Sequence, residues 1–157
     1  MLLYNMKLTQ TIVFIFIVNF IIQYFFMPAI MVTNAIYITN NIGKAYMSTI
    51  MGISMIIFEI IMHDLQYHTL SFNWYTILFA LLAIFIYLYR KQIAINDKQY
   101  LEGMVEHHSM ALLTSEAISK KTDNYYVAKL AKDIIKQQTD EINTMNKLIY
   151  NLNNQRL

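Results

Sequence analysis

The sequence predicts an all-α protein with two parts, three transmembrane helices followed by an antiparallel helical hairpin. The first observation is the uneven placement of charge. Of the 22 charged side chains (12 basic and 10 acidic), only five lie in the first 90 positions: Lys7, Lys44, Glu59, Asp64 and Arg90. The second is a set of three apolar runs near the ~20 residues that a span needs, at about 11–32, 46–62 and 74–89. The third is helical periodicity around a short turn in residues 96–152. We therefore expect a membrane region over residues 1–91 and a hairpin over 96–152.

Composition excludes several classes of function. The net charge of +2 is small and no basic run occurs, so nucleic acid is not an expected partner. The chain has no cysteine, which excludes disulfides, thiolate metal sites and cysteine nucleophiles.

The three apolar runs predict an integral, multi-pass membrane protein with lipid as a partner. The first run carries the only proline, Pro28, where we expect a kink. A polar connection, residues 33–43, leads to the second run. Lys44, Arg90 and Lys91 flank the spans on the side of the hairpin, which favours a cytoplasmic hairpin.

The second run carries a stripe with helical spacing, formed by Met47, Met51, Met55, Glu59 and Met62. Methionine stripes usually serve packing between helices. A carboxylate inside an apolar span is costly, however, and normally faces a partner or a pathway unless it reaches water near the interface. If Glu59 faces a partner, we expect it to pair with His63; the stripe and His63 are then the candidate membrane relay of the alternative, metal-transport hypothesis. The next polar residues, Asp64 and His68, are expected to lie with His63 in a solvated loop.

The hairpin is predicted from its caps and stripes. Asn96 or Asp97 can cap a first helix that runs to about Ser119, and Thr122 or Asp123 can cap the second. A turn this short makes the two helices antiparallel neighbours. Folding the hairpin about the turn places His108 roughly level with residues 134–138.

The stretch 100–112 gathers more potential metal ligands than any other part of the sequence. His108 and Gln138 interrupt the apolar stripes of the two helices, and polar groups at such a seam must be hydrogen-bonded or bound to something. We expect one pocket with five members: Met104, His108, Gln138, Glu141 and Met145. His107 shares the neighbouring face with Met104 and Met110, and it is expected to serve a partner's site. The alternative is a satisfied polar network without metal.

Imidazole and thioether groups without thiolate favour Cu(I), with zinc less favoured because structural zinc usually recruits cysteine. An enzyme is not expected. Ser109 follows His108 directly, and adjacent residues of a helix do not face each other.

The hairpin resembles a known family in two blocks. They are Tyr100-Leu101-x-Gly103-Met104-x-x-His107-His108-x-x-Ala111-Leu112 and Ile134-Ile135-x-x-Gln138-x-x-Glu141-Ile142-x-x-Met145. These are similar to the helical family named domain of unknown function 305, and the second run resembles that family's membrane-anchored branch. The resemblance implies a ferritin-like bundle associated with copper, with the His-His and Met positions as ligands. Members commonly have proline before the His pair; here Glu106 takes its place and adds an oxygen ligand.

A hairpin of this size cannot bury a sufficient core alone, so we expect a homodimer that forms a four-helix bundle, or contact with the membrane half. The sequence thus predicts a copper-binding or copper-buffering membrane protein. The alternatives are a metal-transport component that uses the stripe of the second run, and a structural protein whose hairpin mediates oligomerisation.

Overall fold

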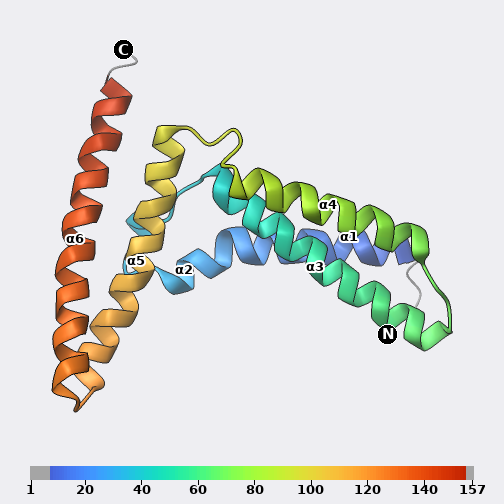
Figure 1. Ribbon diagram of the computed structural model, residues 1–157, viewed down its shortest axis with the longest axis horizontal. Helices are drawn as coiled ribbons and strands as arrows, with labels where there is room; N and C mark the ends of the chain where they lie inside the picture. Colours follow the sequence, from blue (N-terminus) through green and yellow to red (C-terminus); the bar gives the residue numbers. More distant parts are fainter. Residues whose placement is uncertain (1–7, 155–157) are drawn as a thin grey trace. The chain divides into compact units, whose positions relative to one another are not determined.

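The computed structural model describes residues 8–154, and these residues form helices and turns without a strand. The helices are α1 (Leu8–Ile21), α2 (Met27–Met31), α3 (Ile42–Tyr67), α4 (Phe72–Arg90), α5 (Asp97–Lys121) and α6 (Tyr125–Asn154) (Figure 1). A π-helical turn, Ile22–Phe26, joins α1 to α2, and a 3₁₀ turn, Ala35–Tyr37, precedes α3. The all-α prediction is therefore confirmed. The described residues divide into two compact units, 8–26 with 44–94 and 27–43 with 95–154.

Among the described residues, three helical segments are long and apolar enough to cross a membrane: Leu8–Met31, Ile42–Tyr67 and Phe72–Arg90. They contain nearly all of the expected spans 11–32, 46–62 and 74–89. The second helix is longer than predicted at both ends, because helical hydrogen bonding continues through polar residues that the apolar run excludes. Most side chains of these segments are not buried inside the protein, which is compatible with a lipid environment.

The π-helical turn lies directly before Pro28, where the sequence predicts a kink. A proline ring in an α-helix clashes with the carbonyl four residues earlier, here that of Tyr24. The wider i→i+5 spacing of a π-turn moves that carbonyl away. The proline is thus accommodated by a change of helix type in the turn that precedes it.

The first unit packs α1, α3 and α4 around a core that is mainly isoleucine: Ile12, Ile53, Ile56, Ile57, Ile60 and Leu78. Small residues one turn apart, Ser48 and Gly52, are buried on α3. A Cβ atom added at Gly52 would lie 2.9 Å from Cδ2 of Phe16. Small residues at this spacing allow membrane helices to approach closely, and here the space at Gly52 is occupied by the Phe16 ring.

The end of α3 corrects the prediction of a solvated loop at His63 and Asp64. Both residues lie inside α3, and Asp64 is buried. Its carboxylate accepts hydrogen bonds from Thr69 Oγ1 (3.0 Å), Ser71 N (2.7 Å), Ser71 Oγ (2.8 Å) and Tyr75 Oη (3.1 Å). Only His68, with φ of 52°, lies in the connection as expected. Asp64 therefore ties the start of α4 to the end of α3.

In the second unit, α5 and α6 form the expected antiparallel hairpin (Figure 1). Its buried core is Val105, Leu112, Ile142 and Met145. Burial of a side chain such as Ile142, which is 1% exposed, contributes about 1.5–3 kcal/mol. Asn96 caps α5 as predicted, since its side chain accepts from Gln99 N. The predicted cap of α6 is wrong: Asn124 Oδ1, rather than Thr122 or Asp123, accepts from the N–H groups of Tyr126 and Val127.

The polar connection before α3 belongs to this unit and lies against α5. Thr39 N donates to Glu106 Oε2 at 2.8 Å, and Thr39 Oγ1 donates to the carbonyl of Glu102 at 3.1 Å. Further along α5, Ser109 Oγ accepts from Thr33 N at 3.0 Å. A Cβ atom added at Gly103 would lie 3.6 Å from the Asn41 side chain, which is an ordinary contact distance. The hairpin thus gains a third packed segment from its own chain, residues 27–43; the expected dimer stays a prediction.

We predict that Gly52→Ala and Gly103→Ala differ in their effect on stability. Both gain up to about 1 kcal/mol of helix propensity. Gly103→Ala makes only an ordinary contact, whereas Gly52→Ala must displace Phe16, which costs about 1–3 kcal/mol. When unfolding of the whole protein in detergent is monitored by circular dichroism, the free energy of unfolding should be higher for Gly103→Ala than for Gly52→Ala. Equal unfolding free energies would contradict the close approach of α1 and α3.

We also predict that Glu106→Leu lowers the free energy of unfolding by about 1–3 kcal/mol, because Thr39 loses the acceptor for its backbone N–H. The same measurement on Glu116→Leu, an exposed position of the same helix, is the control and should change by less than about 0.5 kcal/mol. A Glu106 variant as stable as this control would show that the connection is not held by the carboxylate.

Candidate functional site

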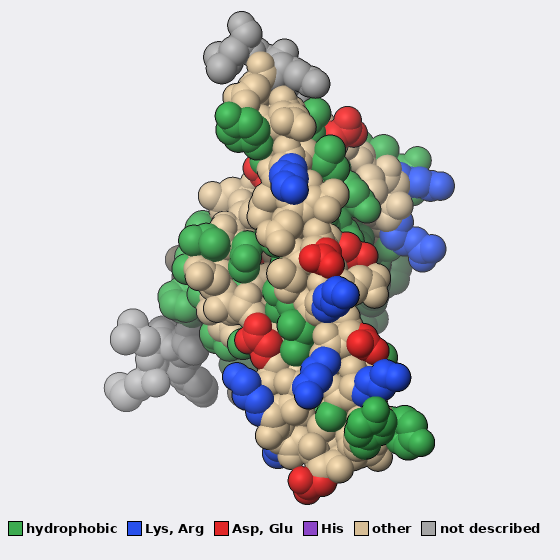
Figure 2. Space-filling model, turned by 90° about the vertical axis from the view of Figure 1, so that its left-hand side faces the viewer, with side chains coloured by type: hydrophobic (Ala, Val, Ile, Leu, Met, Phe, Trp, Pro, Cys, Tyr) green, Lys and Arg blue, Asp and Glu red, His purple; other side chains and the backbone are tan. Residues whose placement is uncertain are grey.

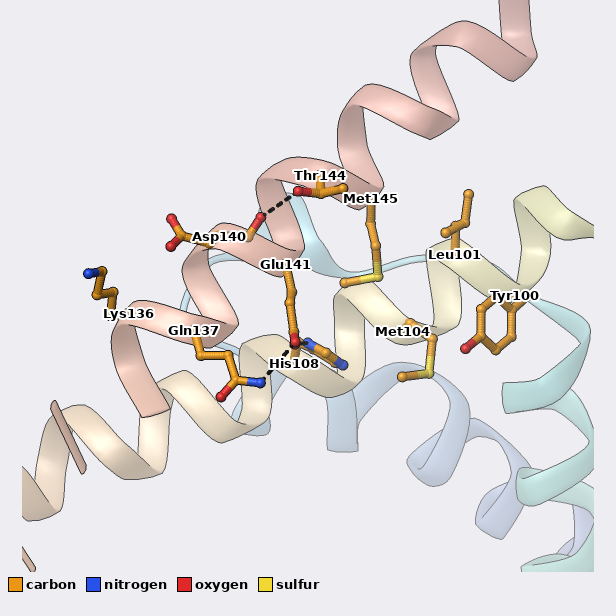
Figure 3. Close-up of a pocket in the computed structure, with 10 residues that line it drawn as sticks. All are labelled: Tyr100, Leu101, Met104, His108, Lys136, Gln137, Asp140, Glu141, Thr144 and Met145. Atoms are coloured by element: carbon orange, nitrogen blue, oxygen red, sulfur yellow. Dashed lines mark hydrogen bonds and ion pairs between the residues drawn. The ribbon is translucent and has the colours of Figure 1, made fainter. Parts of the chain in front are cut away.

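A groove of about 610 Å³ lies between α5 and α6 (Figure 3). Helical spacing places its lining on both helices. The residues from α5 are Tyr100, Leu101, Met104 and His108, and those from α6 are Lys136, Gln137, Asp140, Glu141, Thr144 and Met145. Residues three, four and seven apart share one face of a helix, so each set forms a continuous wall.

The centre of the groove holds a pair of titratable groups. His108 Nδ1 lies 3.0 Å from Glu141 Oε2, and the two side chains are 14% and 41% exposed. The Nδ1 atom is itself buried and has no hydrogen-bond partner among the described residues, so its approach to Glu141 is close without being a hydrogen bond. The other carboxylate oxygen of Glu141 accepts from Gln137 Nε2 at 3.0 Å. Glu141 is thus held from one side by Gln137 and faces the imidazole on the other.

This arrangement leaves the second imidazole nitrogen, Nε2, on the open side of the groove. Figure 3 shows it directed to the side on which the thioethers of Met104 and Met145 lie. Met145 is buried and Met104 is half-buried. Metal-binding histidines commonly have their other ring nitrogen at a carboxylate, which fixes the ring orientation and raises its basicity. The groove therefore brings His108, Met104 and Met145 together as candidate donors, with Glu141 beside the imidazole.

Within residues 8–154, no group of three or more histidine, aspartate or glutamate side chains gathers closely enough to hold a metal. The lining of the groove adds the thioether sulfurs of Met104 and Met145 to the single imidazole of His108. Those sulfurs select soft ions such as Cu(I).

Four of the seven predicted ligands line the groove, and three do not. The four are Met104, His108, Glu141 and Met145. His107 is exposed and Met110 is half-buried, both outside the groove. Gln138 is also outside the groove. It lies on the same face of α6 as the buried residues Ala131, Ile142 and Met145, whereas Gln137 lies on the face of Glu141.

The register of the hairpin differs from the prediction by about one turn. His108 lies opposite Glu141 instead of residues 134–138. Two differences at the turn explain it. Helix α5 continues past Ser119 to Lys121, and α6 begins at Tyr125 after Asn124, one to two residues later than a cap at Thr122 or Asp123 would place it. Each residue of α5 therefore meets a residue correspondingly further along α6.

Glu106, predicted as an added oxygen ligand, is buried on another face of α5, where it binds Thr39. Two positions along an α-helix correspond to about 200°, so Glu106 and His108 point in nearly opposite directions. The glutamate is an anchor for the connection, and the prediction that it binds metal is wrong.

The predicted membrane relay lies on α3, and its methionines are on the outside of the first unit. Met47, Met51 and Met55 are about 40% exposed and Met62 is 63% exposed. They therefore do not fill gaps between the described helices. Glu59 is half-buried and makes no hydrogen bond or ion pair with another residue between 8 and 154. The expected pair of Glu59 and His63 is absent, since His63 Nδ1 lies 3.3 Å from Asp64 Oδ1.

Sequence reasoning missed the part that Gln137 and Tyr100 play in the groove. Gln137 could have been found from its spacing of four to Glu141, which brings their side chains together on a helix. Tyr100 is four residues before Met104 and extends the same wall. No local sequence pattern shows whether an exposed residue of this kind faces the groove or open solvent. That depends on the position of the neighbouring helix.

Comparisons with known proteins agree with the resemblance of the hairpin. Residues 88–155 match the family described as Domain of unknown function (DUF305), a region that includes all of α5 and α6. An uncharacterized protein of Acanthamoeba polyphaga mimivirus is 44% identical over 70 residues, which are 45% of this chain and 46% of that protein. The chain thus spans less than half of that relative's length. No solved structure matches it. The hairpin that carries the groove is therefore the part of the chain similar to the DUF305 family.

Proposed function

We propose that this chain is an integral membrane protein whose hairpin binds or buffers copper as Cu(I). The observation that carries the proposal is the groove, which one imidazole and two thioethers line together (Figure 3). The donors would be Nε2 of His108 and the sulfurs of Met104 and Met145, with Glu141 beside the ring.

The chemistry of the donors favours Cu(I) over other ions. Magnesium and calcium require several oxygen ligands, and structural zinc usually recruits cysteine, which the chain lacks. Soft thioethers together with imidazole suit Cu(I). The Glu141 carboxylate beside His108 makes zinc the second choice, because rotation of its side chain would add an oxygen ligand.

Membrane integration is supported by the apolar surfaces of three helices. In the most apolar stretches of Leu8–Met31 and Phe72–Arg90, nearly all residues are not buried inside the protein. In water such large apolar surfaces would promote aggregation, whereas a bilayer covers them. The hairpin, which carries most of the charged residues, would lie outside the bilayer as a tethered copper-binding unit.

We predict that His108→Ala weakens Cu(I) binding at least about tenfold, which corresponds to about 1.4 kcal/mol. Met104→Leu and Met145→Leu should each weaken it as well, because a leucine keeps the volume but offers no donor. The measurement is a competition titration of the whole protein in detergent, under reducing conditions, against a chromogenic Cu(I) chelator.

The matched control is His107→Ala, which removes an exposed imidazole from the adjacent position of the same helix. Its affinity should equal that of the unaltered protein. Equal affinities for the His107 and His108 variants would reject the groove as the copper site. If the protein binds Zn(II) more tightly than Cu(I) in a parallel titration, the metal assigned to the groove would be zinc instead of copper.

A second candidate function, metal transport, is favoured by the outer position of the α3 stripe. Met47, Met51 and Met55 present thioethers at successive turns, and Glu59 follows on the same line without a partner among the described residues. A carboxylate in an apolar helix is normally paired or functional. A second copy or another protein against this face would enclose a line of soft ligands.

We predict that, if the chain transports copper, Glu59→Gln reduces copper uptake into proteoliposomes without changing the affinity of the hairpin. Glutamine keeps the shape of the side chain and removes its charge. Uptake should be followed with a copper-sensitive dye inside the vesicles, with empty vesicles as the blank. Uptake at the parent rate in the Glu59→Gln protein would end the transport hypothesis and leave the copper-binding proposal intact.

A further inference from the structure

The end of the hairpin where α5 meets α6 exposes several apolar and aromatic side chains. We call this the hairpin tip; its apolar members are Ile118, Tyr125, Tyr126, Val127 and Leu130. Tyr125 and Tyr126 are 72% and 80% exposed, and their ring centroids lie 5.6 Å apart in an edge-to-face arrangement. Nothing in the second unit covers them within the described residues. Two adjacent exposed tyrosines with leucine and isoleucine nearby form a surface that water does not favour.

Exposed basic side chains lie in the same segment as these apolar residues. Lys120, Lys121, Lys129 and Lys132 are exposed, and none of them makes an ion pair with another residue in the range 8–154. Residues 118–132 hold four lysines and one aspartate, a net charge of +3. The remainder of the hairpin has the opposite sign: residues 97–117 sum to −3 (one basic, four acidic) and 133–154 to −1 (two basic, three acidic). Figure 2 shows green apolar side chains at the lower end of the hairpin, with blue basic ones above and beside them and a red acidic one below.

Tyrosine and lysine together are suited to one kind of surface. A tyrosine ring places its apolar body among acyl chains and its hydroxyl at the headgroups, which is why tyrosine concentrates at membrane interfaces. Lysine lays its methylene stem on apolar surface and keeps its ammonium group in the polar layer. Basic residues near a bilayer are attracted by anionic lipid headgroups. An acidic protein surface would satisfy the lysines but would not require the exposed aromatic pair.

We propose that the hairpin tip docks on the anionic headgroup surface of a bilayer, an inference that rests on the proposed membrane anchoring of the chain. The three helices that are long and apolar enough to cross a membrane supply the reason for this choice of partner. Only residues 91–96 separate α4 from α5, so a bilayer that holds α4 keeps lipid at a high effective concentration around the hairpin. Weak surface binding, from a few apolar and basic side chains, then suffices, as it does for proteins that combine an anchor with a basic patch.

The experiment uses the whole protein in lipid nanodiscs with one fluorescent reporter at the tip. Trp74 is the only tryptophan, so a Trp74→Phe, Tyr126→Trp protein reports on position 126 alone. Brominated lipids quench tryptophan at the bilayer interface. In nanodiscs with brominated phosphatidylserine the reporter should lose most of its emission at about 0.1 M salt and regain it at about 1 M salt, where charge is screened within about 3 Å.

Two charge variants test whether the quenching depends on the lysines of the hairpin tip. Replacement of Lys120, Lys121, Lys129 and Lys132 by glutamine should abolish the quenching. Replacement of Lys98 and Lys147, which lie on the same hairpin away from the tip and outside the groove, should leave it unchanged. Circular dichroism confirms that both variants keep their helix content. Copper affinity should stay the same in both, so that this test is independent of the copper site.

Several results would overturn the proposal. One is an unquenched reporter in anionic nanodiscs, with helix content intact. A second is equal quenching in brominated phosphatidylcholine, which would show insertion without charge recognition. A third is quenching that occurs only after brominated vesicles are added to unbrominated nanodiscs, which would make the partner an apposed membrane.

Discussion

The buried carboxylate of Glu106 is the contact on which the arrangement of the second unit depends. A carboxylate that is 5% exposed is costly unless donors surround it. Thr39 supplies a backbone N–H and a hydroxyl, and Ser109 binds Thr33 three residues further along α5. These contacts hold the connection against one face of α5 and leave another face for α6. Helix α5 therefore packs against both the connection and α6. Glu106, which binds the connection, and His108, which lines the groove, are only two residues apart on this helix.

The fold was predictable where the information is local. Apolar runs and caps at residues such as Asn96 identified the helices, because helical periodicity is a property of neighbouring residues. The roles of Glu106 and Asp64 were not predictable in the same way. Glu106 binds a residue 67 positions earlier, and no periodic pattern encodes a pair so distant. Asp64 follows an apolar run, which suggests a loop. Helix α3 nevertheless continues through it, and the Asp64 carboxylate accepts hydrogen bonds from the following turn and from α4.

The groove shows how a small local error changes a site. The residue types were identified from the sequence, since Met104, His108, Glu141 and Met145 do meet. The longer α5 and the later cap at Asn124 shift the register, which places Glu141 opposite His108, with Gln137 one turn before it. This also changes the expected chemistry of Glu141. Glu141 is now beside His108 Nδ1 and bound to Gln137, two neighbours that the predicted register did not give it.

The contacts within the second unit also constrain how the chain can cross a membrane. The connection 33–43 touches α5 through Thr33 and Thr39, so the connection and the hairpin must lie on one side of any bilayer. The chain between them must then cross an even number of times. The two long apolar helices in that interval, α3 and α4, satisfy this condition, whereas a crossing by only one of them would separate Thr39 from Glu106.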